Sequence, residues 1–302
     1  MKRAFFLFIF LVAACASTPH PPVHVVIVGT TDVHGWFNGH SGKDAQYGGV
    51  ALFASYLNAL RAENGNRVVV VDSGDLFQGT LESNFFEGEP VVRAYNLIGY
   101  AAAAVGNHEF DYGPVGPDSV PRVPGQDPLG ALKKNAAMAK FPFLSANITE
   151  KATGQTPSWV RRYTIVEAGG ARIGIIGLST PDTPNVTVGA NVATLNFGDP
   201  LAATISAARD LRAQGVDAVV VIAHMGGKCS DINDVHDVAS CDQEQEAMQF
   251  LEHLPAGTID AYFAGHTHQQ MRQFVNGVPA VQGLAYSAEF STLDLWVDRG
   301  RH

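Results

Sequence analysis

The chain has few basic side chains, and this shortage argues against one class of ligand. It carries 20 lysines and arginines against 29 aspartates and glutamates, a formal net charge of −9. Proteins that bind long nucleic acids gather basic side chains against the phosphate backbone. We therefore expect no long nucleic acid among its partners. A small phosphate ester stays compatible with the acidic balance, because bound divalent cations would dominate the local field.

The chain also lacks an apolar stretch long enough to cross a bilayer. Its candidate, Phe5–Ala14, falls well short of the roughly 20 residues that a spanning helix needs. Because that stretch follows a basic N-terminus, we interpret residues 1–14 as an export signal. Leu11–Cys15 resembles a bacterial lipobox, in which the cysteine is lipidated, and a cleaved signal without lipid is the alternative. Residues 15–22 would be a proline-rich tether that holds the protein on the periplasmic face of the cell envelope.

Cysteine is scarce as well, with three in 302 residues. With Cys15 assigned to a lipid, Cys229 and Cys241 remain as a pair that flanks a polar loop. An exported protein meets an oxidising compartment, so we expect these two cysteines to form a disulfide. Two free thiols, or an incomplete zinc site with His236, are the alternatives.

Strand-like and helix-like segments alternate from residue 23 onward. Apolar runs predict buried strands at 23–29, 67–71, 101–105, 216–223 and 259–264. Helical spacing of apolar residues predicts helices at 47–63, 90–98, 129–139, 200–214 and 243–254. Further strands are expected at 160–167 and 171–178, which form a hairpin, and at 271–275, 279–282 and 292–297. The alternation favours an α/β (α+β) fold in one domain over residues 23–302.

Five short polar motifs stand where predicted strands end. They read TTDVHG (30–35), DSGD (72–75), GNHEFD (106–111), AHMGG (223–227) and AGHTH (264–268). Together they supply seven candidate metal ligands: Asp32, His34, Asp75, Asn107, His224, His266 and His268. All but the asparagine are carboxylates or imidazoles, the groups that hold divalent ions in hydrolases. Because loops after strands meet at one edge of a sheet, we expect a binuclear metal centre there.

The order and spelling of these motifs resemble the calcineurin-like metallophosphoesterases. D-x-H, G-D, G-N-H-E, a single histidine after a strand, and G-H-x-H follow one another as in that superfamily. TTDVHG, DSGDLFQGT, GNHEFDYG, LSANI and GHTH are more narrowly similar to the catalytic domain of the 5′-nucleotidase family. The resemblance extends from Val25 to Asp298 and implies a four-layer αββα sandwich.

The resemblance also divides the ligands between two ions: Asp32, His34 and His268 for the first, and Asn107, His224 and His266 for the second. Asp75 would bridge both ions, because a carboxylate offers two oxygens. Such a pair clamps a phosphate and activates a bridging hydroxide for direct attack. Gln78 stands where purple acid phosphatases carry an iron-binding tyrosine, so a redox-active iron pair is disfavoured. Manganese, zinc, cobalt and magnesium remain open.

The resemblance gives two neighbouring residues a catalytic role. His108 would face the phosphate together with Asn107, and would stabilise charge or protonate the leaving oxygen. Asp111 would orient its imidazole and favour the charged form. A hydrogen bond within the loop is the structural alternative. Glu109 is either a support for the ligands or a solvated or capping residue, and Trp36 could line the substrate mouth.

The expected function is hydrolysis of phosphate esters, most specifically that of a 5′-nucleotidase-type phosphomonoesterase acting on exported or scavenged nucleotides. A 2′,3′-cyclic nucleotide phosphodiesterase, a UDP-sugar hydrolase and a thiosulfohydrolase-like enzyme are alternatives on the same site. A lipid-anchored metal-binding protein is the alternative without catalysis, although it would need neither His108 nor Asp111. The family's C-terminal substrate domain is absent from this sequence, so we expect either a fragment or a free-standing catalytic domain with different specificity. The oligomeric state stays open.

Overall fold

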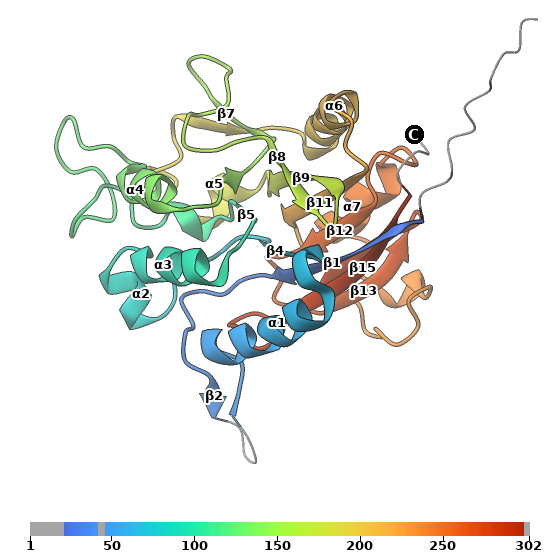
Figure 1. The fold of residues 1–302 in the computed structure, drawn as a ribbon. Helices are drawn as coiled ribbons and strands as arrows, with labels where there is room; N and C mark the ends of the chain where they lie inside the picture. Colours follow the sequence, from blue (N-terminus) through green and yellow to red (C-terminus); the bar gives the residue numbers. More distant parts are fainter. Residues whose placement is uncertain (1–20, 42–45, 299–302) are drawn as a thin grey trace, which may run out of the picture.

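The computed structural model describes residues 21–41 and 46–298. The predicted signal peptide, Cys15 and nearly all of the predicted tether lie outside the described residues. Two larger β-sheets pack face to face, and helices lie on their outer sides (Figure 1). Within the described part of the chain, no helix has both the length and the apolar character that crossing a membrane requires.

The first sheet has five strands in the order β15-β1-β4-β5-β6. Its strands are β1 (Val23–Thr30), β4 (Val68–Asp72), β5 (Ala102–Ala104), β6 (Phe143–Leu144) and β15 (Ser291–Val297). β1, β4, β5 and β6 run parallel, and β15 pairs antiparallel with β1 at the edge. The parallel strands are buried on both faces, which explains their continuous apolar runs.

The second sheet has six strands in the order β13-β14-β12-β11-β9-β8. They are β8 (Tyr163–Ala168), β9 (Ala171–Ser179), β11 (Ala218–His224), β12 (Ala261–Ala264), β13 (Met271–Val275) and β14 (Val278–Gln282). The four inner strands are parallel, and both edge strands pair antiparallel. The hairpin predicted around Gly169-Gly170 is confirmed by the β8–β9 register.

Three apolar cores separate four layers. Ile27 and Val71 of the first sheet meet Ile175 and Val220 of the second in the middle core. Helices α1 (Val50–Asn64), α3 (Glu89–Ile98) and α4 (Gly130–Met138) cover the outer face of the first sheet. Helices α6 (Pro200–Ala213) and α7 (Glu246–His253) cover that of the second. The predicted αββα sandwich is therefore confirmed.

Several short elements were not predicted. β7 (Ile148–Glu150) pairs with β10 (Leu195–Phe197), β2 (His40–Ser41) pairs with β3 (Gln46–Tyr47), and α2 (Leu81–Phe85) and α5 (Thr183–Val186) are single turns. Elements of two to five residues carry too few positions to show a period. The helix predicted from residue 47 begins at Val50, because Gly48 and Gly49 adopt positive φ values of 72° and 84°.

The two cysteines of the described chain, Cys229 and Cys241, form a disulfide. It closes the polar loop between them, and the Cys229 N–H donates to the Gln270 carbonyl just before β13. The loop is thus tied to the second sheet close to the end of β11. Neither sulfur is available for a zinc site with His236.

Candidate metal centre

The five motifs meet at one edge of the sandwich. β1, β4 and β5 of the first sheet and β11 and β12 of the second end there, since they are parallel within their sheets. The Asp32 and His34 N–H groups each donate at 3.0 Å to the backbone of the DSGD loop. Ser73 Oγ donates to the Phe263 carbonyl at 3.1 Å and so joins the two sheets. The candidate ligands lie on these loops and strand ends.

The first triad consists of Asp32, His34 and His268, whose ligand atoms lie within 4.8 Å of one another. The Nε2 atoms of His34 and His268 are 3.2 Å apart, and Nε2 of His268 is 3.4 Å from Asp32 Oδ1. Nδ1 of His34 is 2.5 Å from the Gln78 carbonyl oxygen. That carbonyl can only accept, so Nδ1 carries the proton and the Nε2 lone pair faces the triad.

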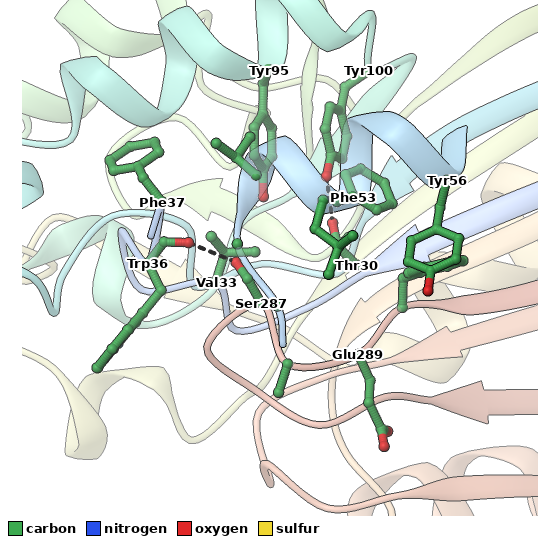
Figure 2. A pocket seen from close by; sticks show the side chains of 16 residues that line it. Thr30, Val33, Trp36, Phe37, Phe53, Tyr56, Tyr95, Tyr100, Ser287 and Glu289 are labelled. Carbon is green, nitrogen blue, oxygen red and sulfur yellow. Dashed lines mark hydrogen bonds between the residues drawn. The ribbon is translucent and has the colours of Figure 1, made fainter. Parts of the chain in front are cut away.

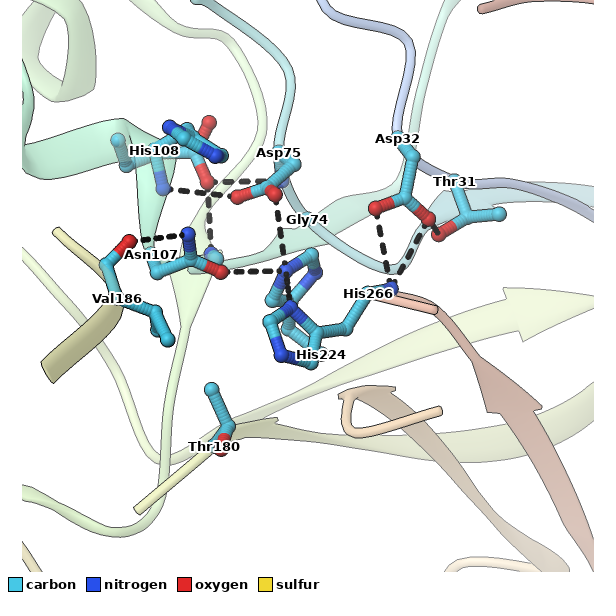
Figure 3. A network of polar contacts seen from close by, with 12 residues as sticks. Thr31, Asp32, Gly74, Asp75, Asn107, His108, Thr180, Val186, His224 and His266 are labelled. Atoms are coloured by element: carbon cyan, nitrogen blue, oxygen red, sulfur yellow. Dashed lines mark hydrogen bonds and ion pairs between the residues drawn. The ribbon is translucent and has the colours of Figure 1, made fainter. Parts of the chain in front are cut away.

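The second triad consists of Asp75, His224 and His266. Nε2 of His224 lies 3.0 Å from Asp75 Oδ2 and 3.2 Å from His266 Nδ1 (Figure 3). Nδ1 of His224 donates to the Ser73 carbonyl at 2.9 Å, which turns Nε2 toward its partners. Donors with lone pairs thus converge on one point, as ligands of a cation do.

Asn107 extends the second triad. Its Oδ1 is 3.0 Å from His224 Nε2, and its Nδ2 donates to the Val186 carbonyl at 3.0 Å (Figure 3). The carbonyl of α5 therefore fixes the amide with its oxygen directed at the triad. All seven predicted ligands are brought together by the fold.

Asp75 lies between the triads. Its Oδ2 is 3.0 Å from His224 Nε2 and 3.8 Å from His34 Nε2. Its Oδ1 instead accepts the His108 N–H at 2.9 Å. One oxygen of Asp75 therefore faces both triads, whereas the backbone of the GNHE loop occupies the other.

Most of the candidate ligands have strained backbones. Five of the seven adopt positive φ values: Asp32 (50°), His34 (49°), Asp75 (58°), His266 (83°) and His268 (55°). Side-chain-bearing residues rarely adopt this left-handed conformation, and it costs about 1–3 kcal/mol per residue in many cases. Such strain persists only where surrounding contacts enforce it. Its concentration here indicates a functional site.

The motif glycines permit the close approach of these loops. A Cβ atom on Gly106 would lie 2.2 Å from Asp75 Oδ1, and one on Gly74 would lie 2.8 Å from His224 Nδ1. Gly74 also has a φ of 98°, which an L side chain resists. Any larger residue at either position would displace a candidate ligand.

Glu109 supports the loops from below. It is buried, and its carboxylate accepts the N–H groups of Asp75 (2.9 Å), Leu76 (2.7 Å) and Gly106 (2.7 Å). These contacts join the DSGD and GNHE loops, so the solvated alternative is wrong. Burial and then the charge of Asp75 raise the pKa of Glu109 to about 8, against the opposing effects of His224 and of the Leu76 and Gly106 N–H donors.

The donor set fits divalent ions. Burial lowers the pKa of His34, and burial together with His224 lowers that of His266 to about 4, so both imidazoles are neutral with available lone pairs. Burial would lower the pKa of His224, but Asp75 raises it to about 10. Burial would likewise raise the pKa of Asp75, but His224 and other imidazoles hold it well below its usual range. The space between these two groups therefore calls for positive charge, which a proton or a divalent ion would supply.

His108 and Asp111 lie together at the rim of the centre. His108 Nδ1 is 2.5 Å from Asp111 Oδ2, and the His108 ring is 5.3 Å from the His34 ring. Burial would lower the pKa of His108, but its hydrogen bond to Asp111 and the charge of Asp75 raise it overall. Thr187 Oγ1 donates to Asp111 Oδ1 at 2.8 Å. Nothing in the sequence motifs pointed to Thr187, which reaches the site from the loop after α5.

Tyr286 is a second residue that sequence reasoning missed. It lies between β14 and β15, and its ring centroid is 5.4 Å from that of His34 and 5.1 Å from that of His268. Its N–H donates to the Asp32 carbonyl at 2.8 Å. Trp36 packs against it with ring centroids 5.7 Å apart, close to the first triad. No sequence spacing marks Tyr286, because it reaches the site through a turn more than 250 positions after Asp32.

A family model and two curated proteins match most of the chain. Residues 25–270 match the model of a family described as calcineurin-like phosphoesterases. A 5′-nucleotidase of Vibrio cholerae is 31% identical over 274 residues, which are 85% of this chain and 43% of that protein. Endonuclease YhcR of Bacillus subtilis is 28% identical over 294 residues, which are 94% of this chain and 23% of that protein.

A solved structure has the same fold. The calcineurin-like phosphoesterase YfkN from Bacillus subtilis superposes with a TM-score of 0.69 at 22% identity, covering 91% of this chain and 85% of that one. At this identity the likeness concerns the fold alone. The chain spans less than half the length of the two curated relatives.

Proposed function

The chain belongs to the calcineurin-like phosphoesterase family, and on that premise we propose that it is a phosphomonoesterase of the 5′-nucleotidase type that needs two divalent ions. The observation that carries the proposal is the position of Asp75 Oδ2 between two triads of metal-binding side chains. The similarity to a 5′-nucleotidase supports the choice of a nucleotide as the substrate.

In this proposal the ions divide along the triads. Asp32, His34 and His268 hold one ion, and His224, His266 and the Asn107 oxygen hold the other, with Asp75 shared. When bound, the ions would withdraw electrons from the phosphoryl group and make an attacking water more acidic. Mixed nitrogen and oxygen ligands suit manganese, zinc, cobalt or magnesium.

The residues at the rim handle the leaving group. Asp111 holds Nδ1 of His108, so Nε2 is the atom that would donate a proton to the leaving oxygen. Thr187 and the short helical turn His108–Phe110, at whose C-terminal end Asp111 lies, keep the pair aligned. Asn107 and His108 would contact the phosphoryl oxygens, because Asn107 Oδ1 lies 3.0 Å from His224 Nε2 and the His108 ring lies 5.3 Å from that of His34. A protein that only stores metal would not need this arrangement.

The test is phosphate release by the purified protein after removal of metal and reloading with manganese, cobalt, zinc or magnesium. The panel holds AMP, UDP-glucose, 2′,3′-cyclic AMP, bis-p-nitrophenyl phosphate and p-nitrophenyl phosphate. We expect metal-dependent release that favours AMP. Preference for a diester would mean that the protein is a phosphodiesterase and not a phosphomonoesterase. Absence of release with both ions bound would overturn the enzymatic proposal.

We also propose that the protein is exported and held on the periplasmic face by a lipid on Cys15. The support is the basic start, the short apolar stretch and the sequence of Leu11–Cys15. Labelling with palmitate in bacterial cells tests it. Label that disappears in Cys15→Ser is expected, and label that persists in that variant would refute lipidation at this position.

A further inference from the structure

The ring of Tyr286 stands beside the partly exposed histidine of the first triad. His268, against which Tyr286 packs edge to face, has a side chain that is 31% exposed. Tyr286 itself is 39% exposed. A large aromatic surface therefore remains in contact with solvent directly beside the first triad.

The backbone that positions this ring is strained. Tyr286 and Ser287 are consecutive non-glycine residues with positive φ values of 61° and 56°. The Tyr286 N–H donates to the Asp32 carbonyl at 2.8 Å, and Ser287 Oγ donates to the Trp36 carbonyl at 2.8 Å (Figure 2). The strained turn is thus tied to the loop that carries Asp32 and His34. Strain retained at such a point is typical of functional positions.

Trp36 extends the aromatic surface. Figure 2 shows it at the edge of an apolar cavity under α1, with its ring directed away from Tyr95 and Tyr100. Tyr95 and Tyr100 are buried core residues, and their hydroxyls bond to Asp72 (2.7 Å) and Thr30 (2.8 Å). Trp36 and Tyr286 are instead the aromatic residues that pack together on the side of the first triad.

We propose that Tyr286, supported by Trp36, is a specificity-determining residue that stacks on the aromatic part of the ester, a nucleobase. The inference rests on the proposed function, in which His108 and Asn107 hold the phosphoryl end. The His34 ring lies 5.3 Å from that of His108 and 5.4 Å from that of Tyr286, so it separates a reacting end from an aromatic end. Every base has a flat face, and stacking on a fixed ring needs no added charge in an acidic protein.

The experiment compares AMP with ribose 5-phosphate, which has the same ester but no base. Tyr286→Asn removes the ring while keeping a residue that tolerates positive φ, and Tyr286→Phe keeps the ring. Trp296→Ala is the matched control, since it removes an exposed aromatic ring at the opposite end of the first sheet. We expect Tyr286→Asn to lower kcat/KM for AMP about 10-fold more than for ribose 5-phosphate, mainly through KM. Tyr286→Phe and the control should keep the wild-type ratio.

Two outcomes would overturn the inference. Equal losses on both substrates, or loss of bound metal, would mean that Tyr286 only supports His34 and His268. If the wild type hydrolysed neither substrate, the proposed function would fail, and calorimetric binding of the same two ligands to the manganese-loaded protein would still decide the inference. A variant that weakens both ligands equally in that measurement contradicts stacking.

Discussion

The two triads of the metal centre differ in how the fold encloses them. His224 of the second triad ends a central strand, is fully buried, and bonds through Nδ1 to the Ser73 carbonyl. Its neighbour Asn107 adds an amide oxygen fixed by α5. In the first triad, every residue lies on a loop with positive φ. Each triad has one partly exposed histidine, His268 in the first and His266 in the second. The difference is therefore that a central strand and a helix carbonyl fix ligands of the second triad, whereas loops hold every ligand of the first.

The two triads also differ in the groups that surround them. Two residues outside the sequence motifs mark this difference: Thr187 contacts Asp111 of the His108–Asp111 pair, and Tyr286 packs against His34 and His268. A ligand bound at the first triad meets solvent, an aromatic ring and a histidine with a raised pKa. A ligand bound at the second triad meets the fixed amide of Asn107 and the fully buried His224.

Asp75→Asn should weaken metal binding at both triads, because Asp75 Oδ2 faces both of them. Breaking a buried charged pair costs about 3–5 kcal/mol, so the affinity of each site should fall roughly a thousand-fold. Elemental analysis after desalting should find both ions lost, and turnover should vanish with them. Asp294→Asn, on the exposed edge strand, is the control. Two full equivalents of metal in Asp75→Asn would show that the shared position is wrong.

His108→Ala should separate metal binding from reaction. His108 belongs to neither triad, so metal content should match the wild type, whereas turnover should fall by roughly 10²- to 10⁴-fold, the usual contribution of a general acid. Steady-state kinetics paired with elemental analysis of the same samples measures both. Normal turnover in this variant would remove His108 from the catalytic role.

His268→Ala should affect metal binding at the first triad only. Because His268 is the exposed member of the first triad, the variant should lose one equivalent of metal and keep the other. In the wild type, a chelator should remove metal in two phases, and this variant should lack the fast one. The matched change His224→Ala should instead remove the slow phase. A single phase in the wild type would mean that the two sites exchange metal as one unit.

Much of this arrangement could be predicted from the sequence. The apolar runs before the motifs gave the central strands within a few residues, since fully buried parallel strands are continuous apolar segments. The motifs gave the residue types of both triads, and the carboxyl ends of parallel strands place them at one edge. The resemblance of the motifs to a known family supplied the four-layer sandwich.

The remainder depends on contacts between distant segments. Thr187 reaches Asp111 only because α5, a single turn, folds over the GNHE loop, and Tyr286 reaches Asp32 through a turn far along the chain. Neither lies in a periodic or spaced pattern. The single-oxygen geometry of Asp75 was also out of reach, because it follows from the His108 N–H that occupies Oδ1. Sequence therefore located the donors, whereas packing determined their direction.

Asp111→Asn should give the smallest effect, and it tests whether the His108–Asp111 pair at the rim of the centre sets the pH dependence of kcat/KM. Asp111 is the main group that raises the pKa of His108 against the effect of burial. A proton donor with a raised pKa works below that pKa and is lost as the pH rises through it. Removing the Asp111 charge lowers the pKa of His108, so the alkaline limb of kcat/KM should move to lower pH. At acidic pH, where His108 is charged in both proteins, the loss should shrink to roughly 10-fold or less. An alkaline limb that stays in place would assign that limb to a group other than His108 and leave Asp111 only a role in orienting the ring.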